Sequence, residues 1–426
     1  MTHTHTALTR LVGELFDPAP VDVAPQVGVE LELFPMRFAR GGPQPVTIDE
    51  LKQIVSCARR VQAEGNVTFE PGGQLELSPA PVATVQALVR QVVDLLDDLC
   101  AGAAAQGVTF KAEGINRWLT SDQIGLQKDT ERYRNMQRHF DAIGTAGREM
   151  MRRTASLQVC LDLLPGRAGH EQWRLLNLCG PALAATFTNQ PNLPALTKPD
   201  VESRTRIWQA VDGSRTGFDG SQFGWQIGSD RINAYCDFAL RAEAIPLDAD
   251  QVEASPFRAP LAQWIASGHC RPTLADLGHH LTTLFPPVRP RWRYLEIRYL
   301  DALPPPWLAT PICLLTTLSY APAARRAALE TLQASRVCLS EQWWRSARHG
   351  LRDAIVRTSA EALFAITSAH LHDLPESYLP ADATALIERY HDRFLVAGRA
   401  PADEDTPDDP VTSWHVSGED TLCALP

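Results

Sequence analysis

The chain has 426 residues, of which 44% are hydrophobic and 21% charged, so it is long enough for one large globular domain or two ordinary ones. The formal net charge of −10, without a dense basic block, argues against a nucleic-acid partner. The nine cysteines are scattered and form no C-x-x-C pair, which argues against a disulfide framework and a structural zinc site. The amino terminus lacks signal-peptide features, and no apolar run reaches the roughly 18 residues of a membrane span, so we expect a cytoplasmic protein without a membrane partner.

The hydrophobic pattern predicts strands interspersed with long helices. In chain order we expect a helix at 8–16, a strand at 26–35, a helix at 47–63 and a strand at 67–78 with a turn at 71–73. We then expect a helix at 81–105, a strand at 108–112, a loop at 116–135, a helix at 135–150 and a strand at 154–163. The remaining elements are helices at 169–188 and 274–284, a strand at 294–299 and a mostly helical segment at 307–396. Strands and helices do not alternate strictly, which favours an α+β fold with an antiparallel sheet.

The domain organisation follows from the same pattern. We expect residues 1–25 to form a helix and entry segment, 26–305 a catalytic core, 306–398 a helical part of the same domain and 399–426 a loose acidic tail. The chain contains no G-x-x-x-x-G-K-[ST] loop, which argues against a P-loop nucleotide site.

Two predicted strands carry glutamates on one face and apolar residues on the other. In GVELELF, alternation puts Glu30 and Glu32 opposite the valine and leucines. In FEPGGQLELS, Glu76 lies opposite the leucines, and Glu70 lies beside the Pro-Gly-Gly turn. A face rich in carboxylates repels itself unless cations or water neutralise it.

Two later strands repeat this alternation. Gln158 and Cys160 alternate with apolar residues in one strand, and Glu296 and Arg298 do so in the other. If the four polar faces meet on one sheet surface, their oxygens suit Mg²⁺ and their arginine suits a phosphoryl group during transfer. The alternative is that each carboxylate points into solvent from a half-exposed antiparallel sheet.

Four segments together resemble a known family. GVELELF, FEPGGQLELS, TASLQVCLDL and HHLTTLFPPVRPRWRYLEIRYLD resemble, in this order, motifs of the glutamate–cysteine ligases of the plant and actinobacterial type. Residues 279–301 are most similar to the actinobacterial ligase of ergothioneine biosynthesis. The segment Arg204–Trp208, with Asp212 and Arg215, also fits the pattern, and so does Tyr235–Leu240. The resemblance extends over residues 26–301 and implies a glutamine-synthetase-like fold, a curved antiparallel sheet with helices behind it.

The resemblance also implies an activity. In this family ATP phosphorylates the γ-carboxylate of L-glutamate, and the amine of L-cysteine attacks the resulting γ-glutamyl phosphate. A carboxylate is a poor electrophile until one of its oxygens becomes a phosphate leaving group. The implied cofactor is Mg²⁺, two or more ions, with ATP as co-substrate.

The resemblance implies roles for particular residues. The metal-binding carboxylates would be Glu30, Glu32, Glu70, Glu76 and Glu296. Glu296 and Arg298 would be catalytic, and Gln158 and Arg298 would bind ATP. Cys160, Arg204, Trp208 and Arg215 would bind the substrates.

Cys160 departs from the family pattern. The family strand reads Q-V-N-L-D where this chain has QVCLD, so a weakly polar thiol replaces an amide. Two alternatives therefore stay open: a related ligase that joins glutamate to another amine, and a catalytically silent nucleotide-binding protein. A nucleophilic role for Cys160 is disfavoured because the chain offers no convincing local histidine partner.

Overall fold

An antiparallel sheet forms the centre of the molecule. A computed structural model of the chain describes residues 3–190, 203–223, 230–246, 258–267, 271–333 and 338–403. The strands are β1 (Val27–Ala39), β2 (Gly42–Pro45), β3 (Val67–Phe69), β4 (Leu75–Leu77), β5 (Thr109–Lys111), β6 (Ser156–Asp162), β7 (Val288–Arg291) and β8 (Tyr294–Asp301). Their hydrogen-bonded order is β3-β4-β1-β6-β8-β7, and β2 and β5 pair with the second half of β1. The predicted α+β class with an antiparallel sheet is confirmed.

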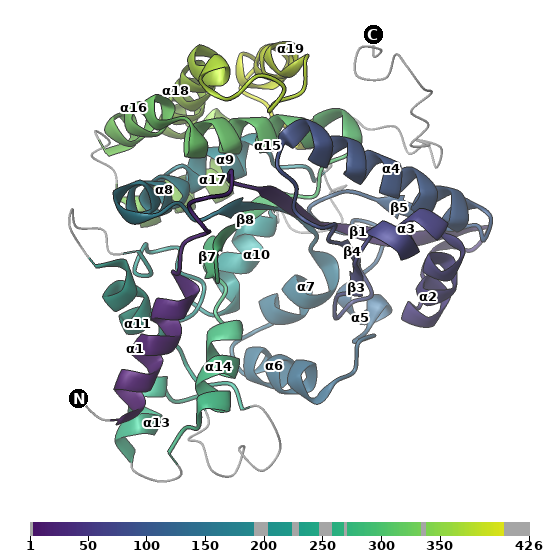
Figure 1. Ribbon diagram of the computed structural model, residues 1–426. Helices are drawn as coiled ribbons and strands as arrows, with labels where there is room; N and C mark the ends of the chain where they lie inside the picture. The colour runs from purple at the N-terminus through teal and green to yellow at the C-terminus, as the bar shows by residue number, and fades with distance from the viewer. Residues whose placement is uncertain are drawn as a thin grey trace.

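Helices lie on both sides of this sheet (Figure 1). They are α1 (His3–Leu15), α2 (Ile48–Cys57), α3 (Arg59–Glu64), α4 (Val85–Ala104), α5 (Ser121–Ile124), α6 (Glu131–Asp141), α7 (Ala146–Arg153), α8 (Gly166–Leu178), α9 (Gly180–Thr186), α10 (Arg204–Val211), α11 (Arg231–Arg241), α13 (Leu261–Ser267), α14 (Leu274–Thr282), α15 (Pro305–Tyr320), α16 (Pro322–Gln333), α17 (Leu339–His349), α18 (Ala354–His370) and α19 (Ala383–Tyr390). On one side α4 and α15 pack against the sheet, and α16, α18 and α19 form a further layer beyond α15. On the other side lie α7, α10, α14 and α1 (Figure 1).

The two faces of the sheet differ in polarity as the alternation predicts. Val29, Leu31 and Leu33 of β1 are 2%, 0% and 0% exposed and join the hydrophobic core. Residues 307–319 of α15 are all buried. A helix that is apolar around its whole circumference is typical of the centre of a large domain. The apolar face of the sheet is therefore held against helices, and the opposite face is left for the glutamates.

Several predicted elements are subdivided in the structure. The single helix expected at 47–63 is wrong, because the chain breaks at Ala58 into α2 and α3. The carboxylate of Asp98 on α4 accepts hydrogen bonds from the backbone N–H groups of Arg60 (2.8 Å) and Val61 (3.2 Å), which begins a new helix. The helices expected at 135–150 and 169–188 are likewise two helices each, and the loop expected at 116–135 contains α5 and the start of α6.

The strand expected at 67–78 is a hairpin of β3 and β4. Its turn is closed by backbone hydrogen bonds from Gly73 N to Glu70 O (2.9 Å) and from Glu70 N to Gln74 O (2.8 Å). Gly73 has φ +83°, a conformation that glycine adopts without steric cost. Strand β7 was not predicted, because its two arginines alternate with valine and proline in the sequence VRPR.

The other predicted helices and strands are confirmed with small shifts of their ends, and the segment 307–396 is mostly helical. The loose tail was expected at 399–426, but residues 399–403 are described and packed on the domain: Pro401–Asp403 form a 3₁₀ helix, and Ala402 N donates to Thr188 O (3.0 Å). Residues 404–426 lie outside the described part of the chain. Among the described residues, no helix combines the length and the hydropathy required to span a membrane.

The β3–β4 turn gives a test of packing. A Cβ atom added at Gly72 would lie 2.5 Å from Arg152 Cα and 2.7 Å from Arg152 O on α7. We expect Gly72→Ala to destabilise the protein by about 1–3 kcal/mol, because backbone atoms must move to admit the methyl group. Gly144→Ala is the matched control, since nothing lies within 4 Å of its added Cβ. Chemical denaturation measures both variants; equal stability of the two would contradict the close packing of this turn.

Candidate functional site

The pairing of the strands brings the predicted polar residues together on one face of the sheet. Glu76 on β4 pairs with Glu32 on β1, and Glu30 pairs with Gln158 on β6. Further along, Cys160 pairs with Glu296 on β8. The expectation that the polar faces meet on one surface is therefore confirmed, because all of these strands are neighbours in one sheet.

One end of this polar face is acidic. We call Glu30, Glu32, Glu70 and Glu76 the acidic end. Glu32 accepts hydrogen bonds from the backbone N–H of Ser156 (2.7 Å) and from the side-chain amide of Gln158 (3.1 Å). Glu76 accepts one from the Thr68 hydroxyl (2.7 Å).

Three carboxyl groups of the acidic end, those of Glu30, Glu32 and Glu70, have raised pKa values. Burial raises the pKa of Glu30 and of Glu70 to about 8 and that of Glu32 to about 7, and repulsion from Glu76 and other neighbouring glutamates adds to each rise. At neutral pH these groups therefore hold protons unless a cation takes their place. Oxygen ligands whose charge is uncompensated fit a hard divalent cation.

The other end of the face is basic. We call Arg289, Arg291, Arg298 and the glutamate they surround, Glu296, the basic end. Glu296 Oε1 accepts hydrogen bonds from Arg289 (2.6 Å) and from Arg298, and Glu296 Oε2 lies 3.5 Å from Arg291 Nε. Burial alone raises the pKa of the fully buried Glu296, but the three guanidinium groups lower it to about 2. Glu296 is thus ionised, and this end carries a net positive charge.

Gln158 connects the two ends. Its Oε1 accepts a hydrogen bond from Arg298 Nη1 (3.0 Å), and its Nε2 donates to Glu32 Oε1 (3.1 Å). A carboxylate at this position would repel Glu32, and an ammonium group would repel Arg298, so an amide suits both neighbours.

Two residues predicted to bind substrate lie beside Arg298. Arg204 donates a hydrogen bond to the backbone oxygen of Arg298 (2.9 Å). The Trp208 ring centroid lies 5.6 Å from Arg298 Cζ and 5.8 Å from Arg204 Cζ, within range of cation–π attraction. The hollow that these residues line has a volume of only about 20 Å³. Among the described residues, they border the polar face and line only this small hollow.

Arg215, also predicted to bind substrate, lies away from the polar face in a buried set of contacts. Its side chain is 0% exposed and pairs with Asp212 (Nε to Oδ2, 2.7 Å). It also donates to backbone oxygens of Thr283 (3.0 Å) and Glu243, and one of its nitrogens lies 3.3 Å from His139 Nε2. With its charge and hydrogen bonds satisfied inside the protein, Arg215 holds three segments together and is not available to a substrate.

Cys160 lies between the ends, opposite Gly28 on β1 and Glu296 on β8. Burial raises the pKa of its thiol well above the usual value, and the nearby Glu30 and Glu296 raise it further. The thiol therefore stays protonated at neutral pH, which agrees with the prediction that Cys160 is not a nucleophile.

The glutamates are spread along the face. Among the described residues, the one group of three metal-ligand side chains with atoms within 4.8 Å of one another is His139, Asp212 and Glu243, next to Arg215. Cations at the acidic end would therefore take only some of their ligands from the protein. Such a site is typical of Mg²⁺ bound together with phosphate oxygens and water.

Sequence reasoning missed Arg289 and Arg291. They lie on β7, the strand that was not predicted, and both face Glu296. The signal that could have found them is the spacing R-x-R next to a strand that carries E-x-R, since two facing strands place such residues on one surface.

The fold and the charged face define a class of protein, an ATP-dependent ligase on a glutamine-synthetase-like curled sheet. Residues 26–406 match the family described as Glutamate-cysteine ligase family 2 (GCS2), and the chain belongs to this family. The resemblance stated from the motifs is therefore confirmed.

Relatives support this assignment. The glutamate–cysteine ligase EgtA of Mycolicibacterium smegmatis is 33% identical over 349 residues, which are 79% of this chain and 78% of that protein. EgtA of Mycobacterium tuberculosis H37Rv is 30% identical over 393 residues, which are 89% of this chain and 85% of that protein. A solved glutamate–cysteine ligase of Francisella tularensis, in complex with AMP, superposes with a TM-score of 0.53 at 11% identity over 89% of this chain and 84% of that one, which shows a shared fold.

The raised pKa values predict a pH-dependent effect of divalent cations. Native Glu30, Glu32 and Glu70 hold protons that the unfolded chain, with pKa near 4.5, releases, so the metal-free protein should lose stability as the pH rises from about 4.5 to 8. Mg²⁺ should raise the melting temperature more at pH 8 than at pH 5.5, because it binds only the ionised carboxylates. The triple glutamine variant at these positions is the control and should abolish the difference. A cation effect that is equal at both pH values would contradict cation binding at the acidic end.

Arg215 gives a second test. Arg215→Met should destabilise the protein by about 3–5 kcal/mol, because it leaves the buried Asp212 carboxylate without its cation. At a temperature where the variant stays folded, its Michaelis constants should be unchanged. Arg206→Met is the control, because it removes an arginine that is only half-buried, and it should destabilise the protein less. If Arg215→Met were as stable as the wild type and had raised Michaelis constants, this result would support the predicted contact between Arg215 and a substrate.

Proposed function

We propose that the protein joins the γ-carboxylate of L-glutamate to the amine of L-cysteine, with ATP converted to ADP and phosphate, and so forms γ-glutamylcysteine. The observation that carries this proposal is the polar face itself, on which protonated carboxyls at one end lie beside an ionised arginine cluster at the other. The chain's membership of its family agrees with the chemistry that such a face can support.

In the first step, a γ-carboxylate oxygen of glutamate attacks the γ-phosphorus of ATP, and ADP leaves. The acidic end suits the binding of two or more Mg²⁺ ions, which would neutralise phosphate oxygens. Arg298 is ionised at neutral pH and lies between Gln158 (3.0 Å) and Glu296, where its guanidinium can attract the oxygens of the group in transfer. We propose Gln158 and Arg298 as contacts to the ATP phosphates.

In the second step, the amine of cysteine attacks the acyl carbon of γ-glutamyl phosphate. The C–N bond forms as the C–O bond to phosphate breaks, and the amine loses a proton. The guanidinium groups of the basic end can stabilise the departing phosphate dianion. Arg204 and Trp208 hold Arg298 from behind, so we propose that they position it.

Glu296 has a double role in this proposal. It keeps the arginines oriented. Its buried Oε2 lies 3.5 Å from Arg291 Nε and accepts no hydrogen bond from the described residues, so this oxygen can also take a cation. The same oxygen could therefore join the acidic end in holding Mg²⁺, as the family resemblance implies.

The wider context follows from the substrates and the relatives. We propose ergothioneine biosynthesis as the pathway, supported by the similarity to EgtA proteins. The cytoplasm supplies ATP, glutamate and reduced cysteine. We further propose that 26–305 and the helical segment 306–398 act as one catalytic unit, since α15 packs directly on the sheet.

A second candidate is a ligase that joins glutamate to another amine, and Cys160 favours it. The thiol lies next to Glu296, where the family has an amide, so a hydrogen-bonding contact to a substrate is weakened.

The test is ADP release with Mg²⁺, ATP and L-glutamate, with and without L-cysteine, followed by mass analysis of the product. We expect ADP release that depends on cysteine, and a product with the mass of γ-glutamylcysteine. Turnover that responds to a different amine would select the second candidate, and no turnover with any amine would refute both.

Glu30→Gln should separate catalysis from stability. The amide resembles the protonated carboxyl that the metal-free protein contains, so the fold should be retained, while ATP turnover should fall at least about 100-fold because a cation ligand is lost. Glu64→Gln, at an exposed position on α3, is the control and should keep full activity. Full activity of Glu30→Gln would contradict a metal-binding role of the acidic end.

A further inference from the structure

The β3–β4 turn that carries Glu70 is held by two residues of the loop between α5 and α6. Gln127 N and Lys128 N donate to Pro71 O (2.7 and 3.2 Å). Lys128 Nζ donates to Phe69 O (2.7 Å). The backbone oxygens on both sides of Glu70 are therefore bonded to this loop, so the turn is fixed before any cation binds.

The side chain of Gln127 fixes the shape of the turn without adding charge. It donates to Gly72 O (3.1 Å) and Val46 O (3.3 Å) and accepts from Ile48 N (3.1 Å). Its carboxamide also packs against Gly73, where an added Cβ atom would lie 2.7 Å from Gln127 Cδ. The side chain therefore ties the turn to the start of α2.

Lys128 brings a positive charge to the acidic end. Its ammonium group contacts two neutral groups, the backbone oxygen of Phe69 and the ring of Tyr133, whose centroid lies 5.5 Å from Nζ. Neither contact cancels the charge. Burial and repulsion from neighbouring glutamates raise the pKa of Glu70, and Lys128 opposes this rise more than Arg298 does.

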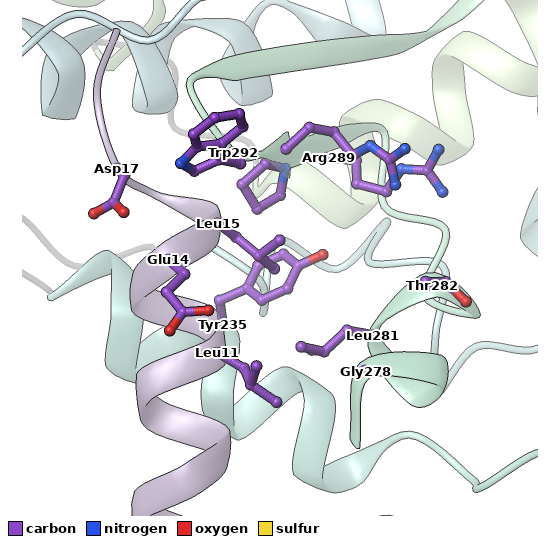
Figure 2. A pocket seen from close by; sticks show the side chains of 12 residues that line it. Leu11, Glu14, Leu15, Asp17, Tyr235, Gly278, Leu281, Thr282, Arg289 and Trp292 are labelled. Carbon is purple, nitrogen blue, oxygen red and sulfur yellow. The ribbon is translucent and has the colours of Figure 1, made fainter. Parts of the chain in front are cut away.

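The arginines of the basic end lie at a different part of the sheet. β7, which carries Arg289 and Arg291, is at the opposite end of the strand order from β3 and β4. Figure 2 shows Arg289 on the wall of a pocket of about 470 Å³, whose other walls come from α1, α11 and α14. Lys128 is therefore a cation of the acidic end itself, separate from this arginine cluster.

A fixed ammonium group beside cation-binding carboxylates acts in opposite directions on two kinds of ligand. It repels a bare Mg²⁺ ion. It attracts a complex of Mg²⁺ with a nucleoside triphosphate, because the phosphates carry more negative charge than the ion neutralises. Mg²⁺ should therefore bind weakly to the free protein and more strongly together with the nucleotide.

We propose that Lys128 makes cation binding at the acidic end depend on the nucleotide. Its charge disfavours Mg²⁺ alone and favours Mg²⁺ bound to the phosphates of ATP, so the carboxylates take up cations when the co-substrate is present. The inference rests on the proposed function for the identity of the nucleotide. Lys128 acts through its charge and its hold on the backbone before Glu70, and it is a positioning residue in the proposed reaction.

Direct binding tests this proposal without turnover. Mg²⁺ is titrated calorimetrically into the nucleotide-free protein, and a non-hydrolysable ATP analogue is titrated in the presence of excess Mg²⁺. Both titrations are made at pH 9, above the raised pKa values of Glu30, Glu32 and Glu70, so that protons do not compete with the cation. Lys128→Met removes the charge, and Lys128→Arg keeps it.

Two further variants are controls. Lys52→Met removes the same charge from an exposed position on α2, where Lys52 pairs with Asp49 at 2.8 Å. It should leave both affinities within about twofold, because solvent and salt screen exposed charges. Gln127→Met loosens the turn without a change of charge, so it should weaken the binding of Mg²⁺ and of the nucleotide alike.

We expect Lys128→Met to bind Mg²⁺ about threefold to tenfold more tightly than the wild type, and the ATP analogue about threefold to tenfold less tightly. Lys128→Arg should keep both affinities within about threefold of the wild type, because the charge is retained. If Lys128→Met does not fold, Lys128→Gln also removes the charge, keeps an N–H donor for Phe69 O and is expected to show the same changes. Unchanged or weaker Mg²⁺ binding, or unchanged nucleotide binding, would overturn the proposal.

These outcomes separate the inference from the proposed function. If the wild type made no γ-glutamylcysteine, the proposed function would fail, yet opposite changes in the two affinities of Lys128→Met would still support the role of Lys128. If the wild type made the product while Lys128→Met weakened both ligands, as Gln127→Met should, only the inference would fail.

Discussion

The buried carboxylate of Glu296 is the constraint on which the polar face depends. An ionised group without any solvent exposure is stable only when cations surround it, and here Arg289, Arg291 and Arg298 do so. The three arginines in turn are held close together by that single carboxylate, although they repel one another. The result is a fixed positive charge at one end of the sheet face, which needs no conformational change to attract an anion.

The acidic end shows the opposite response to burial. Glu30, Glu32 and Glu70 have no arginine shell, so burial raises their pKa values to about 7 or 8 and these three groups take up protons when no cation is bound. Gln158 lies between the acidic end and the basic end. Its side chain donates a hydrogen bond to Glu32 and accepts one from Arg298. The strand order β4-β1-β6-β8-β7 thus places the acidic end and the basic end on one face of the sheet. A reaction between a metal-bound nucleotide and a carboxylate, as proposed, requires such an arrangement.

Alternation along the strands was sufficient to predict the composition of the face. Glu30, Glu76 and Glu296 were found because each lies between apolar neighbours, and the family motifs added the fold and the reaction. The partners of these residues were harder to predict. Arg289 and Arg291 belong to a strand whose proline weakens the β pattern. The burial of Arg215 with Asp212 could not be predicted either, because it depends on tertiary packing between segments distant in sequence.

The account claims that cations bind along the acidic end and not at the trio of His139, Asp212 and Glu243, which Arg215 already neutralises. Anomalous scattering from Mn²⁺, used as a substitute for Mg²⁺ in crystals grown with a non-hydrolysable ATP analogue, tests this claim most directly. The account predicts anomalous peaks within coordination distance of Glu30, Glu32, Glu70 or Glu76. Peaks confined to the His139 trio, or nucleotide bound without any peak at the acidic end, would contradict it.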